Sequence, residues 1–535
     1  MSIDIAKRIT VDREVHGNGV VMEEVEGPDI ERRAGKIDTA GRFGSDAHEL
    51  SNEHNTGPPL CWKIVSQPRS TLPRTSLICL LALLAVLYGV AWFAPAIGLA
   101  YSDGASLAMA VTHKSNGSPP LFPAVLALFA LVSRHAQWLR LVPILCTFFW
   151  LALTRRLLTK MGATQECGWM LVAITAASPT VLYLATGLFP EPLFALLITA
   201  CLLALLDDRP LLAGLCAGLA TIAMTAGAAI VAACLFTLVS HRRVRSAAIF
   251  AGASMVFAAP WLGWTLAQDG VPALKLHLSE QAVLFVSNAM LLAASPFTLL
   301  SGYANLYPGL LTAVALLIVL IRRRQFVPDL FFGLYCVVLM FRVQPPLHAF
   351  APVLPLFLWI LWRVARNGRF ATVTRTTALI MVLPALWFCV SRVYPAVARG
   401  AVAAEAAPPD NWHEMEKLFV FIRANTPADA VLLANLDPVF YLNTGRTTVR
   451  GFAPDHYRSY YAPPSSLVTP DELVTSIRRD RVSYVVLSPD RDLPESASFH
   501  KAVAALERGG VLEPVDVPGV TEDYRLLRLR RPVSK

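Results

Sequence analysis

Residues 75–395 carry very few charged side chains, and this constrains the fold more than any other feature of the sequence. They hold 28 of the 85 charged residues in 321 positions, about 9%, whereas the other 214 positions hold 57, about 27%. Soluble proteins average about 25% charged residues. Apolar runs such as 76–97 reach the length of about 20 residues that a helix needs to cross a bilayer. The sequence therefore predicts a membrane region with several spans.

Arginine clusters at the ends of the apolar runs set the direction of the chain, because short cytoplasmic loops are enriched in Lys and Arg. Eleven spans that start inside place 14 Lys and Arg in cytoplasmic loops and 6 on the outer side. We therefore expect an α-helical polytopic membrane protein with about eleven transmembrane helices. The predicted spans are 77–96, 139–157, 169–188, 192–206, 210–225, 227–240, 246–266, 303–321, 327–342, 350–364 and 374–391.

Two further apolar stretches, 119–132 and 282–300, are predicted to be surface or re-entrant helices. Counting either as a single span would move later arginine clusters to the outer side, against the positive-inside rule. The neighbouring spans 210–225 and 227–240 are short and rich in glycine, including Gly214 and Gly218. Small residues of this kind favour close packing of membrane helices.

The two ends of the chain have ordinary soluble compositions. Residues 1–74 are polar, and the first apolar run begins only at about Leu77, so we predict a disordered cytoplasmic tail and no signal peptide. The membrane region is then 75–395, with an outer loop at 97–138, and eleven spans place 396–535 in the periplasm. Strands at 430–435, 482–488 and 524–529 and helices at 469–479 and 497–508 predict a C-terminal α/β domain there.

Composition excludes several classes of function. The net charge of +9 comes from arginines beside apolar runs, which indicates membrane orientation and no nucleic-acid partner. Seven of the nine cysteines lie in or beside apolar runs, so no disulfide or zinc framework is expected. The C-terminal region has no glycine-rich phosphate loop, paired-cysteine motif or nucleophile elbow.

Carboxylates close to the bilayer are costly, so each one is a candidate functional residue. Eleven spans that start inside place four carboxylates on the outer side of the membrane region: Asp103, Glu191, Asp269 and Glu280. Asp103 follows the first span and Glu191 joins the third and fourth. The two can converge on one site, where one takes a proton from an acceptor and the other orients a metal or a second group. The alternative is that both are solvated loop residues, with the prolines around Glu191 marking a tight turn.

A phosphate-bearing lipid needs cations near the interface. Lys114, Arg140 and Arg342 lie on the same predicted side, and Arg342 at the end of an apolar run is the best candidate. An arginine that extends to the lipid headgroups is the alternative. We also assign His348 and Tyr303 to substrate binding, although a structural interfacial histidine and an aromatic-belt tyrosine explain the same positions.

The order of these features resembles the GT-C class of membrane glycosyltransferases, which includes protein mannosyltransferases and the aminoarabinose transferase of lipid A. The resemblance covers about residues 77–530. Its motifs are matched by Asp103-Gly104-Ala105, Pro119-Pro120-Leu121-Phe122-Pro123, Arg140-Leu141-Val142-Pro143, Arg155-Arg156, Ser178-Pro179, Glu191-Pro192-Leu193, Gly218-Leu219-Ala220, Pro352-Val353-Leu354-Pro355 and Asn425-Thr426-Pro427-Ala428-Asp429. Many members have an acidic residue at the position of Gly104, an arginine at Met224 and Arg-Tyr at His348-Ala349.

The resemblance implies transfer of a sugar from a polyprenyl-phosphate donor to an acceptor on the outer face of a bacterial inner membrane. Asp103 would then be the general base, Glu191 its partner or a metal ligand, and Arg342 or Lys114 would stabilise the leaving phosphate. The acceptor is a glycolipid, a polysaccharide or a protein. No cofactor is assigned, and the need for a divalent cation is left open.

Two other functions fit the same sequence pattern. A transporter or lipid flippase is also polytopic, but transporters often show internal repeats and binding sites at the midplane, which we do not find in the sequence. A non-catalytic GT-C relative would keep the membrane scaffold without the chemistry. Substitution of Asp103 distinguishes this relative from an enzyme, because only an enzyme loses transfer.

Overall fold

The computed structural model describes most of the chain after residue 118. The described residues are 119–133, 136–268, 278–301, 326–341, 348–366, 412–449, 468–488, 494–521 and 523–530, with Ala85, Tyr88 and Gly89. The tail 1–74, the predicted spans 303–321 and 374–391 and nearly all of 77–96 lie outside them, as do Asp103, Lys114, Tyr303 and Arg342.

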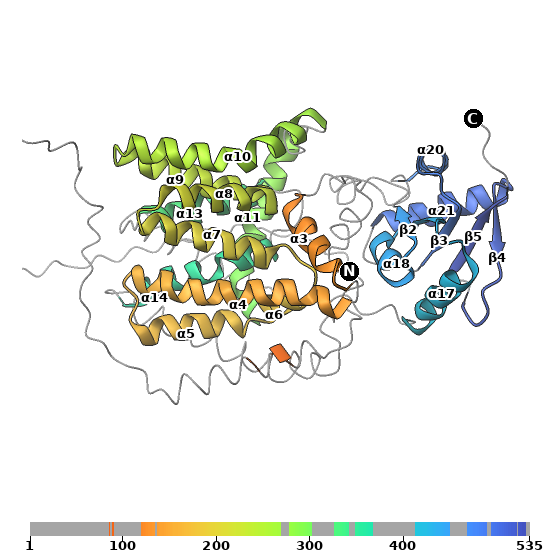
Figure 1. Ribbon diagram of the computed structural model, residues 1–535, viewed down its shortest axis with the longest axis horizontal. Coiled ribbons are helices and arrows are strands. Elements are labelled where there is room, and N and C mark those ends of the chain that lie inside the picture. The colour runs from red at the N-terminus through yellow and green to blue at the C-terminus, as the bar shows by residue number, and fades with distance from the viewer. Residues whose placement is uncertain are drawn as a thin grey trace, which may run out of the picture. The chain divides into compact units, whose positions relative to one another are not determined.

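The part of the chain before residue 367 is helical (Figure 1). In Figure 1, α10, α7 and α4 run across the view one below another, and α11 runs across their direction. Helix α4 packs on α7, α7 on α8, and α8 on α10. The helices are α3 (Leu121–Ala130), α4 (Ala136–Lys160), α5 (Gln165–Ala176), α6 (Pro179–Thr186), α7 (Glu191–Leu206), α8 (Pro210–Ala223), η2 (Thr225–Gly227), α9 (Ala228–Ser240), α10 (Val244–Gln268), α11 (Leu278–Ser301), α13 (Phe326–Met340), η4 (His348–Val353) and α14 (Leu354–Arg366).

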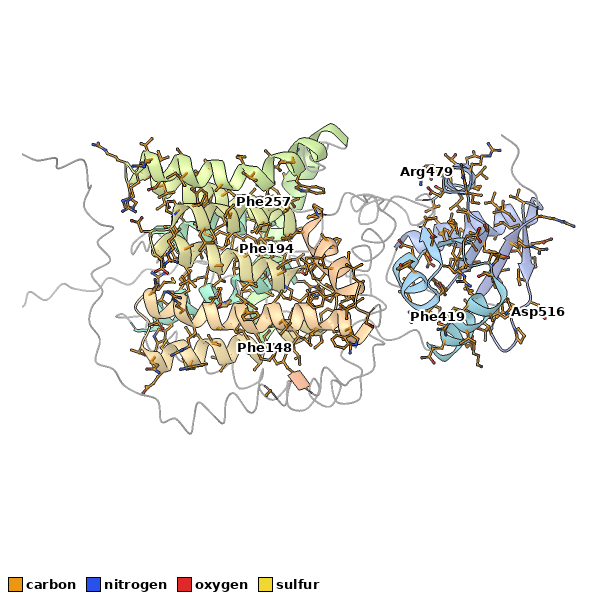
Figure 2. All side chains as sticks on the ribbon, in the orientation of Figure 1. Phe148, Phe194, Phe257, Phe419, Arg479 and Asp516 are labelled. Carbon is orange, nitrogen blue, oxygen red and sulfur yellow. The ribbon has the colours of Figure 1, made fainter. Side chains whose placement is uncertain are left out.

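These helices have the character of a membrane region. Within the described residues, Trp138–Lys160 and Val244–Gly263 are each long and apolar enough to cross a bilayer, and seven shorter apolar helices accompany them. Phe194 of α7 is fully buried, whereas Phe148 of α4 is 41% exposed on the outside (Figure 2). Exposed apolar side chains around a packed interior suit a lipid solvent. Each predicted span within the described residues is mostly helical, but the total of eleven spans stays a prediction.

One predicted span is not a continuous helix. Residues 169–188 form α5 and α6, which meet at a bend of 65°. The break lies at Ser178-Pro179, because a residue before proline is disfavoured in the helical conformation. Ser178 has an extended conformation and its hydroxyl accepts a hydrogen bond from the Val181 amide at 3.5 Å. The Tyr88 hydroxyl donates to the freed carbonyl of Ala176 at 3.4 Å, so the broken end has a partner inside the bundle.

Glycines bring α8 and α10 into backbone contact, as the sequence predicts. A Cβ at Gly214 would lie 2.5 Å from the carbonyl oxygen of Phe250, and one at Gly218 would lie 2.5 Å from that of Ser254. Neither distance is possible without separating the helices.

We therefore expect Gly218→Ala to destabilise the helical part by about 1–3 kcal/mol, the usual cost of overpacking. Thermal unfolding of the purified protein in detergent measures this. The matched control is Gly252→Ala on α10, where a Cβ meets no atom within 4 Å. The control is expected to gain about 0.5–1 kcal/mol from helix propensity. Equal melting temperatures for the two variants would contradict the close approach.

The C-terminal part is an α/β fold with a five-stranded sheet. The strands run in the order β2-β1-β3-β5-β4; β1 is parallel to β2 and β3, and β5 is antiparallel to β3 and β4. The elements are α17 (Trp412–Asn425), β1 (Val431–Ala434), α18 (Asp437–Thr444), β2 (Thr447–Val449), α20 (Pro470–Asp480), β3 (Tyr484–Leu487), α21 (Pro494–Arg508), β4 (Leu512–Val515) and β5 (Arg525–Leu529). All five predicted elements of this region are present.

Helices cover both faces of this sheet, so the strands are buried on two sides. Leu433 and Val485 pack with α20 and α21, whereas their neighbours Leu432 and Val486 pack with α17 and α18. Successive side chains of a strand point to opposite faces, which places the two clusters on the two sides. This explains why β1 and β3 are continuous apolar runs in the sequence.

Candidate functional site

Charged side chains gather at one end of the helical part, and positions along the helices can be measured from this end. Arg156 Nη2 of α4 lies 3.3 Å from an Oδ2 of Asp207, the residue that caps α7, and Lys160 also pairs with Asp207. Arg243, just before α10, contacts Asp208 at 2.5 Å. Because the C-terminal ends of α4 and α7 meet at Asp207 and the helices pack together, the two run in the same direction.

Arg140 and Glu191 lie at the same level near the other end of these helices. Arg140 precedes Arg156 by sixteen residues, and Glu191 precedes Asp207 by sixteen. At 1.5 Å per residue, each lies about 24 Å from the charged end. The hydrocarbon core of a bilayer is about 30 Å thick. The two groups therefore lie near the interface opposite the charged end.

Both groups are buried in shared surroundings. Arg140 is 4% exposed and Glu191 is 7% exposed. Leu139 and Val142, which flank Arg140, form one hydrophobic cluster with Leu188 and Leu193, which flank Glu191. Phe122 and Leu126 of α3 belong to the same cluster, so the helix predicted to be a surface or re-entrant one packs beside the segments that carry both charges. Burial of ionised groups is costly, so this place is a candidate functional site.

Glu191 lies at the start of a well-packed helix. It is the first residue of α7, directly after Pro190. One turn later, Phe194 stacks on Tyr335 of α13 with ring centroids 5.8 Å apart. The carboxylate is therefore held on a rigid, packed element.

His348 lies at the same end as Glu191. Its ring centroid is 5.7 Å from that of Tyr183 and 6.3 Å from that of Phe189, two residues before Glu191. The Tyr335 hydroxyl donates to the carbonyl of Ala349 at 2.6 Å and ties α13 to η4. Of the seven predicted site residues, the structure thus gathers Arg140, Glu191 and His348 at one end of the helical part, and the other four lie outside the described residues.

The comparisons with known proteins concern the fold. No protein-family model matches the chain, and no curated protein has a significantly similar sequence. Among solved structures, ArnT from Cupriavidus metallidurans in the apo state matches over 85% of this chain and 98% of its own, at 14% identity and a TM-score of 0.50. The same protein bound to undecaprenyl phosphate matches over the same shares, at 14% identity and a TM-score of 0.51. This chain has a GT-C-like fold.

A weaker likeness, at a TM-score of 0.42 and 12% identity, is to the Archaeoglobus fulgidus oligosaccharyltransferase tethered to an acceptor peptide; it covers 83% of this chain and 74% of that one. The likeness to ArnT confirms the fold that the sequence resemblance implied.

Of the two predicted metal ligands, Glu191 lies within the described residues. No group of three or more His, Cys, Asp or Glu side chains in the described part of the chain is placed to hold a metal ion. Asp103 lies outside that part, so a shared site of Asp103 and Glu191 stays a prediction.

The sequence did not single out Tyr183 and Phe189 as members of the site. Phe189 begins the segment Phe189-Pro190-Glu191-Pro192, and Tyr183 lies within an apolar run. Their only signal was proximity to Glu191, because an aromatic residue in a membrane span looks the same whether it faces lipid or a site.

Proposed function

We propose that this protein is a membrane glycosyltransferase that moves a sugar from a polyprenyl-phosphate donor to an acceptor at the end of the helical part that carries Glu191. The observation that carries the proposal is a buried carboxylate and a buried guanidinium, Glu191 and Arg140, at one level of a GT-C-like fold. The similarity to ArnT, solved with undecaprenyl phosphate, supports a lipid-linked donor.

In the proposed reaction, a sugar moves from the lipid phosphate to an acceptor hydroxyl. Asp103 takes the proton of an acceptor hydroxyl, whose oxygen attacks the anomeric carbon of the sugar. The bond from that carbon to the phosphate oxygen breaks, and polyprenyl phosphate leaves with the electron pair. Glu191 orients Asp103 or a metal ion.

Cations stabilise the leaving phosphate as its charge grows. Arg140 is the described member of this set, and Lys114 and Arg342 are the predicted ones. His348 and Tyr303 contact the donor beside them. A polyprenyl phosphate keeps its headgroup at the interface, which is the level of Arg140.

The end with Glu191 is the periplasmic one in this proposal. Cations outnumber anions at the opposite end, and the positive-inside rule assigns such an end to the cytoplasm. The charged residues there are Arg155, Arg156, Lys160, Glu166, Asp207, Asp208, Arg209, Arg242, Arg243 and Arg245. The N-terminal tail is then cytoplasmic, the α/β domain is periplasmic, and the membrane is the bacterial inner membrane. The acceptor is a glycolipid, a polysaccharide or a protein.

Deletion of the gene tests this function. The deletion strain is expected to lose one sugar from its envelope glycans and to accumulate a sugar-bearing polyprenyl phosphate, as measured by mass spectrometry of lipids and glycans. A plasmid with the wild-type gene should restore both. An unchanged glycan profile would contradict the proposal and favour transport or a scaffolding role.

A further inference from the structure

Three half-buried rings meet beside Glu191. They come from different segments: Tyr183 from α6, Phe189 from the turn before α7, and His348 from the start of η4. The centroids of Tyr183 and Phe189 are 5.0 Å apart, and His348 lies 5.7 and 6.3 Å from them. We call these three side chains the aromatic wall.

The aromatic wall belongs to the interior of the helical part. Tyr183 and Phe189 pack against its main hydrophobic core. Residues 349–353 of η4, which follow His348, are buried and contact α6, α7 and α11. Lipid-facing aromatic residues differ in this respect: Phe149 of α4 and Phe236 of α9 are about 60% exposed on the outside. The wall therefore presents its partly exposed rings at the end of the bundle that holds Glu191.

Gly187 makes room for the wall. A Cβ at this position would lie 2.5 Å from Cε2 and 2.6 Å from Cδ2 of Phe189. The backbone of Gly187, with φ −90° and ψ 179°, is open to any residue. Glycine is thus needed here for space, because the Phe189 ring folds back over the chain toward Tyr183.

We propose that the aromatic wall binds the sugar of the lipid donor and selects it; this inference rests on the proposed function. Ligand sites combine apolar and aromatic walls with a few polar groups that fix orientation. The three rings supply flat faces for the C–H groups of a sugar, and the tyrosine hydroxyl and the imidazole hydrogen-bond to hydroxyl groups. An isoprenoid chain needs neither polar group. Glu191, which the proposed function places beside the reacting anomeric carbon, follows Phe189 by two residues.

Competition between two lipids tests the wall. The proposed function predicts both sugar-bearing and sugar-free polyprenyl phosphate in lipids extracted from the deletion strain. Native mass spectrometry of the purified full-length protein gives the ratio of the two that it retains. Phe189→Leu and Gly187→Ala are expected to lower the bound ratio of sugar-bearing to sugar-free lipid by about tenfold. Phe285→Leu is the matched control, because Phe285 pairs with Phe341 at 5.2 Å in a separate aromatic contact; it should leave the ratio unchanged.

The possible outcomes separate the two proposals. An unchanged ratio in Phe189→Leu and Gly187→Ala, or equal loss of both lipids, would overturn the role of the wall and leave the proposed function standing. A wild-type protein that retains no sugar-bearing polyprenyl phosphate would overturn the proposed function itself. Tyr183→Phe keeps the ring and removes one hydroxyl, so it tests the wall if the other variants do not fold. A lowered ratio of sugar-bearing to sugar-free lipid supports the wall, and an unchanged ratio contradicts it.

Discussion

Asp103→Asn is expected to slow sugar transfer by about 10²- to 10⁴-fold, the usual contribution of a general base. The amide keeps the size of the carboxyl group but does not take a proton at neutral pH. Transfer is measured with the purified protein in lipid nanodiscs, using membranes of the deletion strain as the source of donor and acceptor. Binding of polyprenyl phosphate should remain, because Arg140 and the predicted cations are unchanged.

Two further variants test whether the loss of transfer is specific to the proposed site. Asp269→Asn removes another carboxylate on the predicted outer side and should transfer sugar at the wild-type rate. Glu191→Gln should also lose transfer, because in the proposed function this buried carboxylate at the start of α7 orients the base or a metal ion. Wild-type rates in Asp103→Asn would show that this residue is not the base. An equal loss in Asp269→Asn would point to a general effect of outer charge.

Arg363→Ala is expected to destabilise the helical part by about 3–5 kcal/mol, the typical cost of leaving a buried charge without its partner. Arg363 Nη2 of α14 lies 2.5 Å from an Oδ1 of Asp329, in the first turn of α13. The Asp329 side chain is only 5% exposed, so water cannot replace the lost arginine. Thermal unfolding in detergent, followed by loss of the monodisperse peak in size-exclusion chromatography, measures the change.

The matched control for this pair is Arg243→Ala. Its partner Asp208 lies at the same 2.5 Å but is 66% exposed. Exposed pairs contribute about 0–1 kcal/mol, so little change is expected. The double variant Arg363→Leu with Asp329→Leu should recover most of the lost stability, because it removes both buried charges. Equal melting temperatures for Arg363→Ala and Arg243→Ala would refute the buried pair as a stabilising contact.

The sequence predicted the helices of the membrane region well, because burial in lipid leaves a strong local signal. Long apolar runs with arginine at one end mark α4, α7 and α10 to within three residues. The break between α5 and α6 was missed, although Ser178-Pro179 carries a physical reason for it. β2 has only three residues, and β4 contains Pro514, which suits its edge position in the sheet. Neither strand was predicted, because such short strands are stabilised by pairing with neighbouring strands, which a local sequence pattern does not reveal.

The candidate site residues that the structure describes were chosen from the sequence mainly by their charge. Arg140 and Glu191 stood out because ionisable groups are rare in apolar surroundings, and the structure brings both to one level of the bundle. The aromatic wall had no comparable signal, since its three residues are separated by up to 165 positions and only the packing of η4 against α6 and α7 brings them together. Gly187 could be interpreted only once the ring of Phe189 was placed.

In the proposed function, this chain cleaves the bond between a sugar and polyprenyl phosphate. The most direct measurement adds purified wild-type protein to membranes from the deletion strain and follows both forms of the lipid and the acceptor by mass spectrometry. We expect the sugar-bearing lipid to be consumed, an equal amount of sugar-free polyprenyl phosphate to appear, and the acceptor to gain the mass of one sugar. Unchanged amounts of both lipids in the presence of folded protein would contradict the claim.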